Sequence, residues 1–428
     1  MKKSIYPLIV VIAVLFTGTA SATNGYWSHG YGPKSKSIGG ACVAMAFGAM
    51  CAASNPGSLV IVGNRLEVGA SVFAPTRGFV ANSDFDDDGV EPHFARVPAG
   101  KYTSRNDFFL IPHFAYNRML DDVSSIGVAV GANGGMNTDY ESPVFVGFGD
   151  DSSPVGIDMK QMFIGITYSR KLNEQHSIGI TPVLGLQTFE AKGLNAFAWG
   201  SLYPQAVTDN GMDISYGAGL KLGWLWQVND RLNIGASYQS RMWMTDFDDY
   251  KGLFAEGGNF DIPSNYDIGF SYKVTPEVTF AYNFQRINFS EIPAIGNASD
   301  IVMNPLVNSP PYLGCDDCLG FGWDDASIHK FGIQWQYSPA LALRAGYSRA
   351  SDIVPGSQAL FNILAPAVVT EHYTFGFGRK LTEESEINVS FSYMPEDEVY
   401  GTNPNTGPQT GSLFMNQWEI EVGWATRF

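Results

Sequence analysis

Polar and apolar residues alternate with a period of two along most of the chain from Arg65 onward. This period is the repeat of a β-strand, whose successive side chains point to opposite faces, so each segment has one apolar and one polar face. The pattern recurs at residues 330–337 and 341–348 and is clearest in the last segment, residues 418–428. There Trp418, Ile420, Val422, Trp424 and Phe428 share one face, and Glu419, Glu421, Gly423 and Arg427 share the other.

Tight turns alternate with long polar segments between these predicted strands. Six short turns and seven longer connections join fourteen strands in this interpretation. An even strand number, with short turns at one end and long loops at the other, is typical of a bacterial outer-membrane barrel. The short turns are residues 120–122, 172–175, 228–230, 274–277, 338–340 and 381–385.

The N-terminus has the organisation of a secretory signal in residues 1–22. Lys2 and Lys3 precede an apolar run at residues 5–16, and small residues at positions 20–22 form a cleavage site, so the exported chain is expected to start at Thr23. The apolar run is shorter than the roughly 18 residues that a membrane-spanning helix needs. Since only helices and closed barrels satisfy every backbone group in lipid, a membrane-spanning chain of this kind crosses with strands.

The composition narrows the class further. A mean hydropathy of -0.04, with 14% aromatic residues and 47 glycines, fits alternating strands, although a large soluble β-sandwich has a similar composition. Aromatic residues on the outward faces near strand ends favour the barrel. The net charge of -16 argues against a nucleic-acid partner, because few cations are present to neutralise phosphates.

Residues 23–64, ahead of the first strand, do not alternate. They are rich in glycine and alanine, predict a short buried helix at residues 39–46, and break at Asn55, Pro56 and Gly57. A compact, nearly uncharged segment favours a plug inside the barrel, or hatch, over a periplasmic extension, which would be more polar. The predicted fold is an all-β membrane protein: a 14-stranded antiparallel transmembrane barrel at residues 65–428, with a small, mostly helical N-terminal hatch.

Both ends of the chain carry recognisable motifs. Residues 24–40 read NGYWSHGYGPKSKSIGG and are followed by Ser-Asn-Pro at residues 54–56; residues 344–349 read RAGYSR and residues 360–367 read LFNILAPA. Together with the closing strand, these segments resemble the FadL/TodX-like outer-membrane transporters of long-chain fatty acids and other hydrophobic molecules. The resemblance extends over nearly the whole exported chain.

The resemblance implies a mechanism of passive transport across the outer membrane of a Gram-negative bacterium. Substrate would be captured among the extracellular loops, bind in the lumen above the hatch, and leave sideways through an inward kink of the third strand. It also implies a monomer. No cofactor is expected, because no energy-coupling motif appears in the chain. The expected partners besides substrate are outer-membrane lipids, lipopolysaccharide and the barrel-insertion machinery, which reads terminal residues such as Phe428.

The predicted third strand carries a physical cause for such a kink. Gly131, Asn133, Gly134 and Gly135 lie in its middle, and paired glycines permit a bulge that interrupts the ladder between neighbouring strands. We therefore expect a lateral gate here; ordinary close packing against the hatch is the alternative.

The family's hatch has an Asn-Pro-Ala motif that packs against this kink. Asn55 and Pro56 match the motif, whereas Gly57 replaces its alanine, which puts the contact in question. A plain turn is the other interpretation, since any Asn-Pro pair can form one.

A fatty-acid carboxylate in an apolar lumen needs a cation, because an unpaired buried charge is costly. Strand phase puts Arg241, Lys330 and Arg344 on lumen-facing positions. Each of them is a candidate substrate contact, and each could instead pair with an acidic neighbour. An uncharged aromatic or aliphatic hydrocarbon would need no cation.

Two of the predicted external loops are unusually apolar. Phe197 and Trp199 lie in one, and Leu253 and Phe254 in the other. Exposed apolar patches mark binding sites or membrane contacts, so these residues are expected either to capture substrate or to contact lipopolysaccharide.

The four cysteines suggest disulfides in an oxidising compartment. Cys315 and Cys318 would close a small ring in a long external loop, and a metal site there would need more ligands nearby. Cys42 and Cys51 could pair only if the chain turns back between them. Residues 84–89 have the aspartate spacing that opens a calcium loop but lack its final glutamate, so a solvated loop is the default and no metal is predicted.

Two other function classes remain open. Outer-membrane barrels also include enzymes that act on lipids, but none of the six histidines is expected beside a serine or aspartate partner in the lumen. The long loops could also serve an adhesin or a phage receptor.

Overall fold

The structure is a computed structural model that describes residues 24–82, 96–147, 150–303, 308–405 and 409–428. The predicted secretory signal, the expected start at Thr23 and the calcium-loop candidate at residues 84–89 lie outside these described residues.

One closed antiparallel sheet forms the wall of the molecule, because β16 pairs with β1 from Arg427↔Arg65 to Gly411↔Ala81. Of the sixteen strands, β2 extends the line of β3 along β1, and β9 extends the line of β8 along β7. The remaining fourteen confirm the predicted barrel. The strands are β1 Arg65–Ala81, β2 Gly100–Thr103, β3 Phe109–Met119, β4 Ser124–Asn137, β5 Gly156–Lys171, β6 His176–Lys192, β7 Asp213–Gln227, β8 Leu232–Gln239, β9 Trp243–Met244, β10 Asn265–Lys273, β11 Val278–Ile287, β12 Ala326–Ser338, β13 Leu341–Ala350, β14 Glu371–Lys380, β15 Ser385–Thr402 and β16 Thr410–Arg427.

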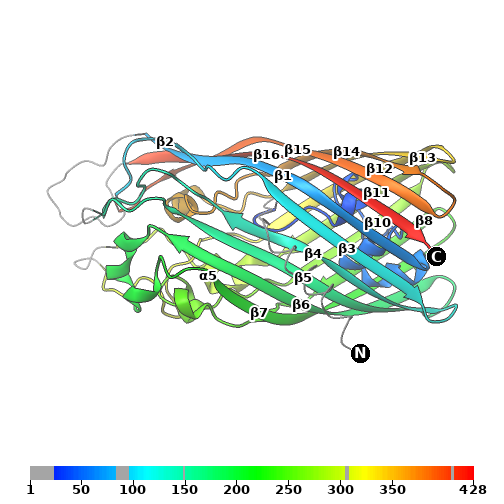
Figure 1. Ribbon diagram of the computed structural model, residues 1–428, viewed down its shortest axis with the longest axis horizontal. Helices are drawn as coiled ribbons and strands as arrows, with labels where there is room; N and C mark the ends of the chain where they lie inside the picture. The colour runs from blue at the N-terminus through cyan, green and yellow to red at the C-terminus, as the bar shows by residue number, and fades with distance from the viewer. Residues whose placement is uncertain (1–23, 83–95, 148–149, 304–307, 406–408) are drawn as a thin grey trace, which may run out of the picture.

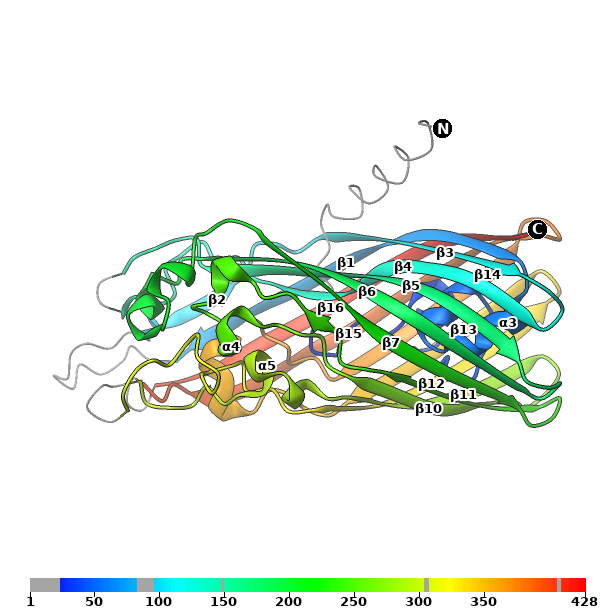
Figure 2. The same cartoon turned by 90° about the horizontal axis from the view of Figure 1, so that it is seen from below.

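The two ends of the barrel differ as the turn pattern predicts. Short turns connect the strands at the end where the C-terminus lies, and the long connections gather at the opposite end (Figures 1 and 2). All six predicted turns join consecutive strands of the structure, and two of them overlap a strand end by one residue, Ser338 and Ser385. The long connections contain the short helices α4 Ala255–Gly258, α5 Pro293–Gly296 and α6 Ala359–Asn362, with 3-10 turns at Asn195–Gly200, Pro204–Ala206, Asp248–Tyr250, Phe289–Glu291 and Gly356–Gln358.

The alternation of the closing strand is confirmed by burial. Ile420 and Val422 are 42% and 43% exposed on the outer face, whereas Glu419 and Glu421 are 1% and 2% exposed on the inner one. The wall therefore presents an apolar surface outward and keeps its carboxylates inside. Among the described residues, no helix is long and apolar enough to cross a membrane.

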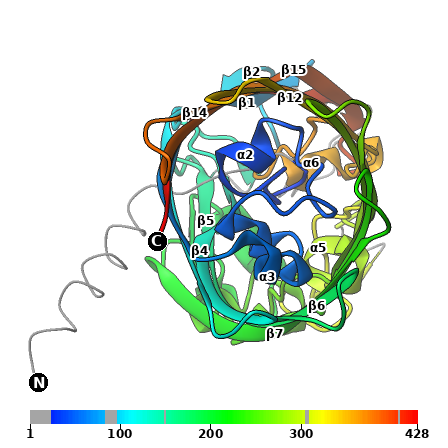
Figure 3. The ribbon, with the colours of Figure 1, turned by 90° about the vertical axis from the view of Figure 1, so that its right-hand side faces the viewer.

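Residues 24–64 lie inside the ring of strands, toward the end with the short turns (Figures 1 and 3). We call this segment the hatch. Its regular parts are α2 Gly32–Lys36 and α3 Leu59–Val62, with 3-10 turns at Ala49–Ala53 and Pro56–Ser58.

The predicted helix at residues 39–46 is wrong, since this stretch is irregular. Gly39 and Gly40 have φ values of 64° and 79°, which an α-helix does not allow. The reason is close packing on the wall: a Cβ on Gly346 of β13 would lie 2.1 Å from the Gly39 nitrogen.

Candidate functional site

The ladder between β3 and β4 ends before the strands do. Their pairing runs from Met119↔Ser125 only to His113↔Gly131, although each strand continues beyond this point along its other neighbour. In the β4–β5 pairing the register shifts between Ala132 and Gly134, which marks a bulge at the glycine-rich stretch. From His113 and Gly131 toward the end with the long connections, the two strands are therefore not paired; we call this unpaired stretch the β3–β4 gap.

The start of the hatch supplies the missing backbone partner for the kinked part of β4. Ser28 N donates to Asn133 O at 2.8 Å, and Gly135 N donates to Tyr26 O at 3.2 Å. The Asn133 side chain accepts from Tyr31 Oη at 2.8 Å and donates to Gln161 Oε1 at 3.0 Å. The hatch thus provides hydrogen-bond partners for backbone groups of β4 that no longer pair with β3 and that lipid could not satisfy.

A pocket lies on the inner side of the gap, between the hatch and the wall. Ile111, Pro112, Gly131 and Ala132 contribute its apolar edge, and Met50 of the hatch closes it from within. A Cβ on Gly131 would lie 3.8 Å from both His113 Cβ and Met50 Cε, so a β-carbon fits there in ordinary van der Waals contact and a longer side chain would press against the pocket lining.

A buried ionic cluster forms the floor of the same pocket. The Lys36 ammonium group of α2 binds the carboxylates of Glu419 and Glu421 on β16, the latter at 3.3 Å. His113 Nδ1 lies 2.7 Å from Glu421 Oε1. Buried charges are normally paired, and separating these would leave ions uncompensated, so this cluster fixes the hatch helix to the strand that closes the barrel.

Aromatic side chains fill the lumen above the hatch. The ring of Tyr26 lies 5.4 Å from that of Phe289 and 5.9 Å from that of Trp323, and the Trp27 ring lies 6.2 Å from that of Phe163. All five belong to, or pack against, one large apolar cluster that continues into the long connections. This interior suits an apolar molecule far better than a hydrated ion.

The family model for outer membrane protein transport proteins (OMPP1/FadL/TodX) matches residues 27–422 of this chain. The chain belongs to this family. It is an outer-membrane β-barrel transport protein.

Solved structures of FadL/TodX proteins have the same fold as this chain. The toluene transporter TodX of P. putida is 18% identical, with a TM-score of 0.68, covering 94% of this chain and 99% of its own. A FadL homologue of Pseudomonas aeruginosa is 14% identical, with a TM-score of 0.69 and coverage of 94% and 100%. The toluene transporter TbuX of Ralstonia pickettii is 16% identical, with a TM-score of 0.63 and coverage of 94% and 99%. No curated protein matches the chain in sequence.

In this FadL/TodX protein the three predicted lumen cations bind protein groups. Arg241 Nε lies 2.6 Å from Asp261 Oδ2, and Lys330 Nζ donates to the backbone oxygen of His29 in the hatch at 3.2 Å. Arg344 Nε donates to Gln334 Oε1 at 2.7 Å, and its guanidinium lies 5.9 Å from the centre of the Phe47 ring. Lys330 and Arg344 thus hold the hatch, and a substrate contact for any of the three stays a prediction.

The apolar loop residues lie in the long connections, as the sequence predicts, but two of them are buried. Phe197 and Phe254 are 2% and 3% exposed, so their expected exposure is wrong. The ring of Phe197 lies 4.8 Å from that of Phe145, and the ring of Phe254 lies 4.7 Å from that of Phe189. Trp199 and Leu253 are half-buried and pack against the same cluster.

The Asn-Pro-Gly motif of the hatch packs away from the kink. Asn55 Nδ2 donates to Trp224 O on β7 at 2.9 Å, and Ser177 Oγ on β6 donates to Gly57 O at 2.6 Å. A Cβ on Gly223 would lie 2.2 Å from Asn55 Oδ1, which explains the glycine facing this motif. The sequence led us to expect a contact between this motif and the predicted third strand, which is β4 in the structure. The motif instead contacts β6 and β7.

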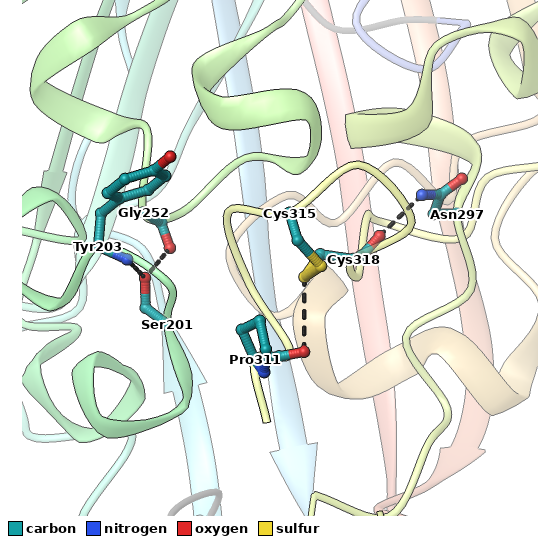
Figure 4. The surroundings of a disulfide bond; sticks show 7 residues. All are labelled: Ser201, Tyr203, Gly252, Asn297, Pro311, Cys315 and Cys318. Carbon is teal, nitrogen blue, oxygen red and sulfur yellow. Dashed lines mark hydrogen bonds between the residues drawn. A yellow bond between two sulfur atoms is a disulfide. The ribbon is translucent and has the colours of Figure 1, made fainter. Parts of the chain in front are cut away.

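The cysteines behave as two different pairs. Cys315 and Cys318 form a disulfide in the long connection between β11 and β12 (Figure 4), where Asn297 Nδ2 donates to Cys318 O at 2.7 Å. Cys42 and Cys51 are both free and buried, and the Cys42 thiol donates to Ser54 Oγ at 3.1 Å. The second possible disulfide is therefore absent from the structure.

One histidine has a serine partner that strand phase did not predict. His29 Nε2 lies 3.2 Å from Ser392 Oγ, and the His29 ring centre lies 5.3 Å from that of His372. His29 and Ser392 are enclosed between hatch and wall with at most 1% exposure. This pair offers no surface on which a substrate could reach the serine.

Proposed function

We propose that this chain is a passive outer-membrane channel for hydrophobic molecules, long-chain fatty acids foremost, which bind above the hatch and leave sideways through the β3–β4 gap. The observation that carries the proposal is the end of the β3–β4 ladder at His113↔Gly131 while both strands continue. A closed ladder would bar lateral exit, because a molecule would have to break several backbone hydrogen bonds in lipid.

The surroundings of the gap support the same route. The hatch is held by buried ion pairs inside the ring of strands, toward the short-turn end, and the cluster above it is aromatic and apolar (Figure 3). An apolar solute gains free energy on entering lipid, about 25 cal/mol per Å² of apolar surface removed from water, so partitioning alone can drive flux. The proposal therefore includes no catalytic step and no cofactor.

The experiment fills the pocket beside the gap without substituting any residue of the ionic cluster. Gly131→Leu places a side chain against His113 and Met50 in this pocket, and Val128→Leu on the lipid-facing side of β4 is the matched control. We expect Gly131→Leu to reduce uptake of labelled palmitate and of toluene by about tenfold, equivalent to roughly 1.4 kcal/mol. The control should leave both unchanged.

Both proteins must first show the folded barrel by heat-dependent mobility on a denaturing gel. Unchanged uptake in a folded Gly131→Leu protein would contradict lateral release. Release of free fatty acid from outer-membrane phospholipid by the purified wild-type protein would favour the enzyme class instead.

A further inference from the structure

The two free cysteines of the hatch lie next to each other. Between Cys42 and Cys51 the chain reverses through two turns, in which Met45 N donates to Cys42 O at 3.0 Å and Cys51 N donates to Gly48 O at 3.1 Å. The reversal brings the two thiol groups into hydrogen-bonding contact. Since the sulfurs already meet, closing an S–S bond of about 2.05 Å requires only local movement of the hatch.

The surroundings of Cys42 favour its reactive form. The Cys51 thiol donates a hydrogen bond to the Cys42 sulfur and lowers the pKa of Cys42, against the opposing effect of burial. The Ser54 hydroxyl oxygen lies 3.1 Å from the same sulfur and can turn its proton toward a thiolate. A thiolate is the nucleophile in thiol oxidation, so Cys42 is the sulfur expected to react first and Cys51 the one that follows.

A pocket leads from this pair toward the short-turn end of the barrel. Cys51 lines the pocket together with Lys34 of α2, Glu67 near the start of β1 and Trp424 near the end of β16. Figure 3 views this end of the barrel, with the hatch inside the ring of strands. Because the free space in the pocket suits water-sized molecules, a small oxidant such as hydrogen peroxide fits it, whereas a protein oxidant is far too large.

The segment between the cysteines carries one wall of the pocket at the β3–β4 gap. Met50 directly precedes Cys51 and lines that pocket together with His113 and Gly131. A bond between Cys42 and Cys51 would close a ring of ten residues that includes Met50. A cross-link restricts the conformations of the segment that it closes, so the disulfide would hold Met50 against the inner side of the gap.

We propose that Cys42 and Cys51 are a peroxide-reactive dithiol, and that their disulfide form restrains Met50 and slows passage through the gap. The second part rests on the proposed transport function and adds a regulation to it.

The reaction balances without a metal or cofactor. The Cys42 thiolate attacks one oxygen of hydrogen peroxide and becomes a sulfenic acid, while the other oxygen leaves as hydroxide and takes up the proton that Cys42 lost. The Cys51 sulfur then attacks the sulfenic sulfur, and the second oxygen leaves as water with the Cys51 proton. The two thiols thus lose two electrons and two protons, and one peroxide becomes two molecules of water.

The test uses the Cys315→Ser/Cys318→Ser protein, whose remaining cysteines are the two in the hatch. The protein is reduced with a phosphine, freed of reductant and treated with hydrogen peroxide. Both thiols should then resist alkylation in denaturant, and peptide mass mapping should join residues 42 and 51. Uptake of labelled palmitate by outer-membrane vesicles that contain the protein should fall by about fivefold, or roughly 1 kcal/mol, and should recover on renewed phosphine treatment.

The matched control carries Cys42→Ser and Cys51→Ser in the same protein. Peroxide also oxidises methionine to its sulfoxide, so a loss of uptake caused at Met50 itself would occur in the control too and would persist after the phosphine. The control should show no response to peroxide.

Thiols that remain open to alkylation after peroxide overturn the inference, and so does a disulfide that leaves uptake unchanged. An equal loss of uptake in the control also overturns it. Each of these results leaves transport standing, because uptake by the reduced protein is measured in the same experiment. Absence of uptake by the reduced protein contradicts the proposed function, while the mass map still decides the chemistry of the two cysteines. If the serine control does not fold, a loss of uptake that persists after the phosphine overturns the inference.

Discussion

The Lys36 ammonium group on the hatch lies 3.3 Å from the carboxylate of Glu421 on β16. The same carboxylate lies 2.7 Å from His113, the last β3 residue that pairs with β4. One side chain of the closing strand therefore connects the hatch to the lower end of the gap.

Loss of the Lys36 charge should loosen the hatch. Lys36→Met leaves Glu419 and Glu421 buried without their cation, and removing one partner of a buried ion pair typically costs about 3 to 5 kcal/mol. We expect faster hydrogen exchange across residues 24–64 in the purified protein, measured by mass spectrometry. Lys273→Met, at an exposed lysine beside a short turn, is the control.

Neutralising the carboxylates as well separates charge from packing. The triple variant Lys36→Met/Glu419→Gln/Glu421→Gln removes the uncompensated charges and should recover most of the lost protection. Equal protection in the wild type and Lys36→Met would contradict the anchoring role.

The same contacts predict the pH above which the hatch should loosen. Burial alone would lower the pKa of the Lys36 ammonium group, but the carboxylates of Glu419 and Glu421 raise it above its ordinary value. A raised pKa means that the contribution to docking is complete below the ordinary lysine pKa of about 10.4 and is lost as pH rises through the folded value. Pulse proteolysis should therefore show constant protection from neutral pH to about pH 10 and a decrease above it. The decrease should be absent in Lys36→Met.

Asn55 should matter as a hatch anchor on β7 rather than as part of the gate. Its side chain donates to Val43 O at 2.7 Å and to Trp224 O at 2.9 Å, and it accepts from Gly57 N at 2.9 Å. Asn55→Ala leaves these buried groups without a hydrogen-bond partner, and each such group lowers the free energy of unfolding by about 1 to 3 kcal/mol. We expect a higher ion leak through single channels in planar bilayers, and Asn82→Ala at the exposed rim should show none.

A leak unchanged in Asn55→Ala, combined with impaired uptake of hydrophobic solute, would instead place this motif at the gate. That outcome would agree with the role that the family resemblance implies for this motif.

Removal of the disulfide should affect the long connections alone. The bridge between Cys315 and Cys318 closes a ring of four residues, whose entropic contribution is only about 2 kcal/mol. The double variant Cys315→Ser/Cys318→Ser should therefore keep the barrel's melting temperature and increase hydrogen exchange near residues 308–320. Increased exchange in the strands would contradict a local role.

The barrel could be predicted from the sequence because its determinants are local. The alternation of a strand and the turn residues that follow it can be recognised in a window of about ten residues. The wall contains fourteen such strands, so the pattern recurs along the chain. The bulge in β4 was predictable for the same reason, since Gly131, Gly134 and Gly135 lie within five residues of one another.

Contacts between distant segments were not predictable in this way. Phe197 and Phe254 look like exposed loop residues until the partners that bury them, Phe145 and Phe189, are placed beside them. The irregular path at Gly39 is set by the approach of β13, which local helix propensity does not report.

The hydrogen bond between Tyr31 and Asn133 should hold the kinked part of β4 against the hatch. Tyr31 Oη donates to Asn133 Oδ1 at 2.8 Å in a part-buried site, where a neutral hydrogen bond contributes about 1 kcal/mol. A double-mutant cycle with Tyr31→Phe and Asn133→Ala, read from hydrogen-exchange opening free energies at residues 131–137, should show a coupling of about that size. The outer-face pair Tyr282 and His329, at 2.9 Å, is the control, since its removal should leave β4 exchange unchanged. Additive effects of Tyr31→Phe and Asn133→Ala would mean that backbone pairing with Tyr26 and Ser28 alone holds the kink.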